Sequence, residues 1–183
     1  MEENRTFLSN YSVFDLIIIA VVSALGVASK PIIVPLVHII TGPLFIPGGA
    51  IAGGFYMFWI VFGAGYVKKT GTGTLIGVVQ GILVIATGTM GTHGIMSLIS
   101  YTLPGIAVDF IFLFSKNKCY NIMHYIIGCM SANMAGTLIT NMMFFRLPHV
   151  TVVLILSCAA LSGAVGGVIA SGILKGLEKL NIL

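Results

Sequence analysis

The polar side chains best suited to chemistry recur at helical intervals. Two sets with a four-residue spacing stand out in apolar surroundings: His93, Ser97 and Tyr101, then Asn133, Thr137 and Asn141. Because residues four apart share one face of a helix, each set predicts a polar stripe. The stripes either line a pocket for a small molecule or hydrogen-bond to one another between helices.

A buried amide and several basic groups extend this pattern. Gln80 lies within an apolar run, and an amide in hydrocarbon must find a partner or face a cavity. Lys30, His38, Arg146 and His149 interrupt the apolar sequence with no acidic residue beside them. Lone histidines at a membrane interface usually pack or face water. Together with the lysine and arginine, however, they favour the basic rim of a site for carboxylates, phosphates or carbonyls.

No catalytic arrangement is present. The sequence has no HExxH motif, no paired carboxylates, and no serine or cysteine near both a base and an orienting acid. The run Thr70-Gly71-Thr72-Gly73-Thr74 lacks the spacing and the lysine of a phosphate-binding loop, so it indicates a turn. The three cysteines are at unrelated spacings and are expected to pack as small apolar residues. We therefore expect neither an enzyme nor an intrinsic cofactor.

The elements that position these residues must lie in a membrane. The chain has 183 residues, of which 57% are hydrophobic and 8% charged, and its mean hydropathy is +1.08. Soluble domains carry roughly 25% charged residues. Residues 1–183 are thus expected to form a single transmembrane domain of a multi-pass cell-membrane protein, with no room for an ATPase module and no cleaved signal.

Six apolar runs predict an all-α bundle of six transmembrane helices. Their approximate ranges are 13–30, 43–66, 73–89, 94–115, 121–144 and 150–176. The segment between the first two, from Lys30 to Pro43, is apolar and proline-rich. We expect it to be a connection that either folds over the helix ends as a lid or lies at the interface.

The distribution of charge predicts the orientation. Two basic residues, Lys30 and Arg146, fall on one side of the predicted bundle. The other side holds Arg5, Lys68, Lys69, Lys116, Lys118, Lys175 and Lys179. The positive-inside rule then places both termini in the cytoplasm. The basic residues are scattered pairs rather than a basic face, so nucleic-acid binding is not expected.

Acidic residues are scarce near the membrane. Only Asp15 and Asp109 approach it, both toward the predicted cytoplasmic side. A proton-driven carrier generally needs a carboxylate relay near mid-membrane, which disfavours a self-powered transporter.

Small residues form a strip on the first predicted helix. Ala20, Ala24 and Ala28 recur every four residues, which permits close contact between helices. The strip packs either within the bundle or against another membrane protein.

With these features the sequence resembles the substrate-binding (S) component of an energy-coupling factor (ECF) transporter. Within that family, Gly42-Pro43, the turn Lys69-Thr70-Gly71-Thr72-Gly73, and Pro104-Gly105 resemble the thiamine/hydroxymethylpyrimidine group. The resemblance implies a vitamin-type binder that joins a transmembrane coupling subunit and two ATPase subunits, which use ATP. It also implies docking through the alanine strip.

The substrate stays open between two classes. Binders of cationic thiamine are expected to offer a carboxylate, whereas the third predicted helix offers Gln80. Haem is the alternative, because His93 and His149 could ligate iron and the basic residues could pair with propionates. The competing functions are a stand-alone carrier or channel for a small organic solute and, less favoured, a small intramembrane enzyme.

Overall fold

The computed structural model describes residues 10–42, 48–88, 94–115 and 120–180. These residues form α-helices and one π-helical turn, and none of them is in a strand. In chain order the elements are α1 (Val13–Ala28), α2 (Lys30–Thr41), α3 (Gly48–Val67), α4 (Thr72–Thr87), α5 (Met96–Leu113), α6 (Ile122–Thr140), η4 (Asn141–Phe145) and α7 (His149–Lys179). The all-α prediction is confirmed, and each of the six predicted spans contains one helix.

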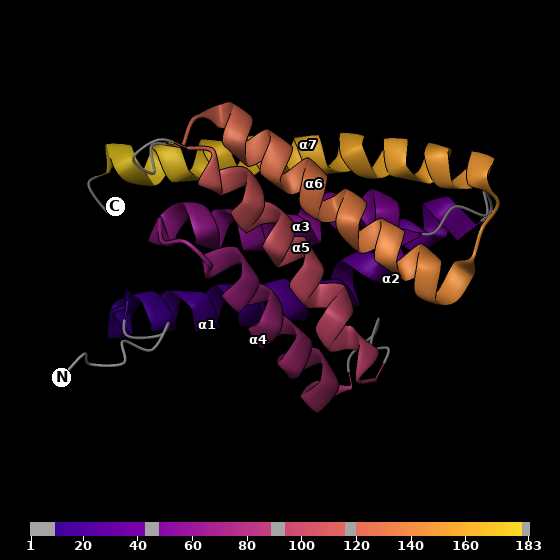
Figure 1. Cartoon of the computed structure of the whole chain (residues 1–183), viewed down its shortest axis with the longest axis horizontal. Coiled ribbons are helices and arrows are strands. Elements are labelled where there is room, and N and C mark those ends of the chain that lie inside the picture. Colours follow the sequence, from indigo (N-terminus) through magenta and orange to yellow (C-terminus); the bar gives the residue numbers. More distant parts are fainter. Residues whose placement is uncertain (1–9, 43–47, 89–93, 116–119, 181–183) are drawn as a thin grey trace.

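The helices pack around α3. It contacts α1, α2, α4, α5, α6 and α7, while α6 lies along α7 and α4 lies along α5 (Figure 1). Glycines bring backbones together at these crossings. A side chain at Gly105 would collide with the backbone of Gly73, and one at Gly166 would collide with that of Gly54. Such small-residue contacts are typical of helix packing in membranes.

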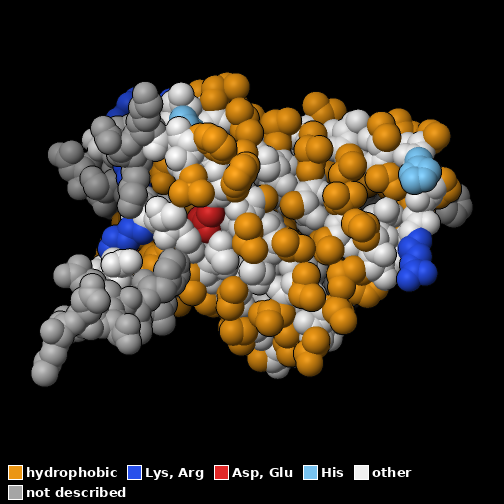
Figure 2. Space-filling view, in the orientation of Figure 1, with side chains coloured by type: hydrophobic (Ala, Val, Ile, Leu, Met, Phe, Trp, Pro, Cys, Tyr) orange, Lys and Arg blue, Asp and Glu red, His pale blue; other side chains and the backbone are white. Residues whose placement is uncertain are grey.

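The surface is that of a membrane protein. Five apolar helical segments are long enough to cross a bilayer, namely Val13–Thr41, Gly48–Val67, Met96–Leu113, Ile122–Phe145 and His149–Lys179. The remaining predicted span, α4, is a shorter apolar helix of 16 residues. Figure 2 shows hydrophobic side chains spread between the two ends of the molecule, with lysine and arginine toward the ends. The multi-pass prediction is confirmed.

The prediction of a connection after the first span is wrong, because Lys30–Thr41 forms the helix α2. Ser29 keeps helical backbone angles, and its hydroxyl donates to the carbonyl of Gly26 at 2.9 Å. Pro31 has no N–H to continue the hydrogen-bond ladder of α1, so the ladder is interrupted at Ser29 and α2 begins with the proline in its first turn. The prolines that indicated a loop are compatible with a helix at these positions.

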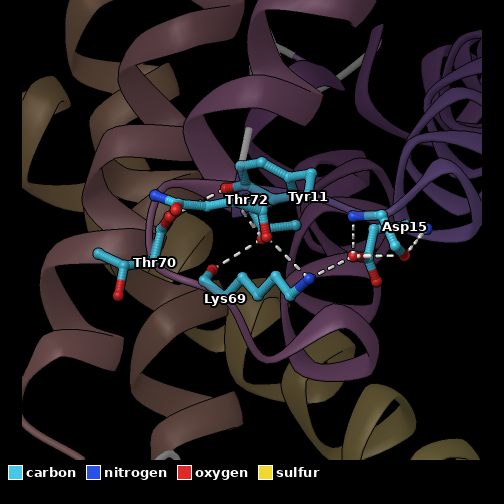
Figure 3. A network of polar contacts seen from close by, with 7 residues as sticks. Tyr11, Asp15, Lys69, Thr70 and Thr72 are labelled. Atoms are coloured by element: carbon cyan, nitrogen blue, oxygen red, sulfur yellow. Dashed lines mark hydrogen bonds and ion pairs between the residues drawn. The ribbon is translucent and has the colours of Figure 1, made fainter. Parts of the chain in front are cut away.

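A polar network ties the start of α1 to the α3–α4 turn (Figure 3). Lys69 pairs with the carboxylate of Asp15, with Nζ and Oδ2 2.5 Å apart. The Tyr11 hydroxyl donates to the carbonyl of Thr70 at 2.9 Å, and the Thr72 hydroxyl donates to that of Lys69 at 2.7 Å. Burial raises the pKa of Tyr11, which keeps its hydroxyl protonated as a donor.

The other end of the chain meets the same turn. Lys68 pairs with Glu178 near the end of α7, with Nζ and Oε1 2.9 Å apart. The start of α1 and the end of α7 therefore lie at one end of the bundle, as the orientation analysis requires. That this end faces the cytoplasm stays a prediction.

Candidate functional site

A cavity of about 360 Å³ lies in the half of the bundle away from the α3–α4 turn. This volume is within the range of small-molecule sites in proteins. Apolar side chains such as Val34, Met57 and Ile60 form part of its wall. The polar side chains of the wall are Lys30, His38, Tyr56, Gln80, Ser100, Tyr101, Asn133, Thr137, Thr140 and Asn141.

Most of the residues expected from the sequence meet in this cavity. The wall includes the expected Lys30, His38, Gln80, Tyr101, Asn133, Thr137 and Asn141. Ser97 is fully buried one turn before Tyr101 but is not part of the wall. Arg146 and His149 are exposed and also lie outside the wall. His93 lies outside the described residues.

Lys30 stands at the start of α2 between two tyrosines. Its ammonium nitrogen lies 3.9 Å from the ring centroid of Tyr101 and 4.9 Å from that of Tyr56, and it donates a hydrogen bond to the Tyr101 hydroxyl. Aromatic faces attract a cation without neutralising it. Among the described residues, the two ion pairs are Lys68–Glu178 and Lys69–Asp15. The positive end of Lys30 is therefore held by aromatic rings rather than by a carboxylate.

Gln80 extends from α4 toward the break between α1 and α2. Its side chain is only 4% exposed, and Nε2 has no hydrogen-bond partner among the described residues. A Cβ atom placed on Gly26 would overlap this amide nitrogen. Only the missing side chain at residue 26 leaves room for the amide.

Asn133 has a structural contact as well as a place in the wall. Its Nδ2 donates to the carbonyl of Ala50 on α3 at 3.0 Å and to that of Ala159 on α7 at 2.8 Å. Asn133 therefore does both things that the sequence left open for this stripe: it hydrogen-bonds between helices, joining α6 to α3 and α7, and it belongs to the wall of the cavity.

A π-helical turn shapes one end of the cavity. In η4, Asn141 and Phe145 both belong to the wall, and Asn141 Oδ1 accepts a hydrogen bond from the Leu147 N–H at 3.1 Å. Arg146 follows with a φ of 47° and ends the helix. Single π-helical turns of this kind frequently occur at functional sites.

The described acidic side chains are engaged away from the cavity. Asp109 on α5 accepts hydrogen bonds from the backbone N–H groups of Gly73 and Thr74, at 2.9 and 2.7 Å. It thus anchors the start of α4 and occupies the amides that a phosphate would use. No acidic residue belongs to the described wall of the cavity.

Three polar residues of the wall were not expected from the sequence: Tyr56, Ser100 and Thr140. Tyr56 lies in the aromatic run from Phe55 to Trp59, where the phase of the helix cannot be read from hydrophobicity. Ser100 falls one residue before Tyr101, off the four-residue stripe. Thr140 likewise falls one residue before Asn141, so none of the three positions stands out by its spacing.

The alanine strip lies on the outside of α1. Ala20, Ala24 and Ala28 are all exposed, whereas Gly26 and Val27 are buried against the bundle. The strip does not pack within the described bundle. It presents small side chains to whatever lies beside α1 in the membrane.

The family comparison indicates membrane transport, and the structural comparison indicates a shared fold. A family model described as the permease component of an ABC-type cobalt transport system matches residues 14–135. A solved structure described as an S-component of an ECF transporter superposes with a TM-score of 0.78 at 16% identity. The match covers 94% of this chain and 88% of that one, which shows a shared fold. No curated protein matched the sequence.

Proposed function

Because the chain belongs to the family of ABC-type cobalt transport system permease components, we propose that this membrane transport subunit captures a small organic micronutrient. The observation behind the proposal is the cavity of about 360 Å³, lined by buried polar groups, within a fold shared with an ECF S-component. The bound molecule would be handed to partner subunits that hydrolyse ATP.

A bare cobalt ion fits the cavity poorly. Divalent transition metals need several imidazole, thiolate or carboxylate ligands. Among the described residues no group of three such side chains is close enough to hold a metal. The wall instead offers the ammonium of Lys30, which repels a cation, and His38 is its one described imidazole. We propose an organic cargo for these reasons.

Of the two ligand classes favoured by the sequence, the cavity suits a pyrimidine-sized vitamin better than haem. His149, one of the two histidines expected to ligate the iron, and Arg146, one of the basic residues expected to pair with the propionates, are exposed and outside the wall. Tyr56 and Tyr101 supply aromatic faces, and Gln80 supplies an amide able to bond a heterocycle.

The partners would be a transmembrane coupling subunit and two ATPase subunits, with the alanine strip on α1 as the contact. Its three alanines are exposed on a membrane-spanning segment, and small side chains allow a neighbouring helix to approach closely. The alternative of a stand-alone carrier is disfavoured because the described cavity wall lacks a carboxylate for ion coupling.

Co-purification tests this assignment. The tagged full chain would be expressed with the coupling subunit and ATPases of its source genome and purified in mild detergent. We expect a stable complex that contains all the subunits. Recovery of the tagged chain alone, folded and able to bind ligand, would contradict the proposed partners.

A further inference from the structure

The cavity contains buried hydrogen-bond donors that nothing in the described structure satisfies. Tyr56 and Gln80 belong to the wall of the cavity, and the hydroxyl of the first and the amide nitrogen of the second are buried without a hydrogen-bond partner among the described residues. An amide nitrogen can only donate, and a phenol hydroxyl donates readily. Buried donors left unpaired are costly, so a bound molecule with acceptor atoms would relieve the cost.

Lys30 adds charge to these donors. An ammonium group has three N–H donors and no acceptor, and the Tyr101 hydroxyl takes one of them. The rings of Tyr56 and Tyr101 flank this nitrogen, and neither described ion pair involves Lys30, so a bound anion would be the group that stabilises its charged form. An ionisable residue within a membrane-spanning segment is expected to serve function.

The three residues come from different helices and belong to the wall of one cavity. The Gln80 amide lies against Gly26, and Lys30 follows Gly26 by four residues. The backbone stays helical through the break, since the Ser29 N–H bonds to the carbonyl of Leu25 and the Ile33 N–H to that of Ser29. Gly26 and Lys30 therefore share one face. Tyr56 is the neighbour of Lys30 on α3, since the centroid of its ring lies 4.9 Å from the Lys30 nitrogen.

We propose that Lys30, Tyr56 and Gln80 form a subsite for an anionic group of the ligand, a carboxylate or a phosphate. Within the proposed function, this assigns the cargo to organic anions. An anionic oxygen can accept from all three donors, and charge-assisted hydrogen bonds to an ammonium are among the stronger ones. The described wall contains no carboxylate that could accept hydrogen bonds from these donors or bind a cationic ligand.

The test is a calorimetric titration of the full chain in nanodiscs with pyrimidines that differ only at C5. The four groups are hydroxymethyl, carboxylate, phosphomethyl and aminomethyl. We expect the carboxylate or the phosphomethyl compound to bind about tenfold or more tightly than the hydroxymethyl compound, the difference that one charge-assisted bond makes. The aminomethyl compound should bind weakest. Whichever of the two anionic compounds binds more tightly shows whether the subsite prefers a carboxylate or a phosphate.

Variants locate the effect. Lys30→Gln should remove the preference for anions, and Tyr56→Phe should reduce it while the ring is retained. Gln80→Glu should shift the preference toward the aminomethyl compound. The matched control is Arg146→Gln, which removes an exposed cation outside the cavity wall and should leave the preference intact.

Several results would overturn the proposal: a wild-type preference for the hydroxymethyl or aminomethyl compound, no binding of either anion, or an anion preference that survives Lys30→Gln. Failure of the proposed function is a separate result. A chain that selects anions through Lys30 but never joins a coupling subunit contradicts only the transport assignment. An assembled complex that selects cations contradicts only the anion subsite.

Discussion

The side-chain amide of Gln80 on α4 occupies the space that a Cβ atom on Gly26 of α1 would fill. The same position is close to Trp59, whose Cβ would lie 3.3 Å from the added atom. The bare backbone at residue 26 therefore sets where the Gln80 amide stands in the cavity.

Replacing Gly26 by alanine should displace that amide and weaken ligand binding. We expect the affinity for the pyrimidine carboxylate to fall by about five- to tenfold, the worth of roughly one hydrogen bond. Calorimetric titration measures the loss. The matched control is Gly172→Ala on α7, where no atom lies within 4 Å of the added Cβ. Equal affinities of the two variants would contradict this role for Gly26.

Removing Asn133 should destabilise the bundle even without ligand. Asn133→Ala deletes the hydrogen bonds to the carbonyls of Ala50 and Ala159, and we expect a loss of about 1–3 kcal/mol in the free energy of unfolding. Asn133→Asp keeps the shape, loses both donors and should destabilise at least as much. Thermal unfolding in detergent measures both. Thr137→Val, one turn along the same face, is the control that should leave stability near wild type.

Most of the helices could be predicted because each is a long apolar run bounded by charge or glycine. The end of α3 at Val67, for example, is followed directly by Lys68 and Lys69. Lys30–Thr41 was predicted to be a connection because its prolines indicate a break after α1, whether a loop or a second helix follows that break. Sequence alone does not show that Ser29 keeps helical angles across that break.

The candidate site could be predicted where helical spacing places polar residues on one face. Asn133, Thr137 and Asn141 follow that rule and all line the cavity. Tyr56 could not be found, since its face depends on how α3 packs at the centre of the bundle. Arg146 ends the π-helical turn in the left-handed region and is exposed, although Phe145 before it and Leu147 after it both line the cavity. Sequence spacing gives no sign of that turn.

Enlarging a side chain on the alanine strip should separate the chain from its coupling subunit without harming ligand binding. Ala24 is exposed on α1, so Ala24→Trp should fold yet hold a partner helix away. The control is Val165→Trp on α7, at a position 61% exposed on another face. Co-purification with the coupling subunit measures the effect. A complex that survives Ala24→Trp, or is lost equally with Val165→Trp, would contradict docking through this strip.

Accumulation of the ligand in proteoliposomes tests the transport account most directly. The chain reconstituted alone should bind the pyrimidine carboxylate but not concentrate it under an imposed proton gradient or membrane potential, because its described cavity wall contains no acidic residue to couple ions. Proteoliposomes that also contain the coupling subunit and ATPases should accumulate the compound when ATP is supplied, and Lys30→Gln should slow that uptake about tenfold at ligand concentrations below Kd. Gradient-driven accumulation by the chain alone would contradict the account.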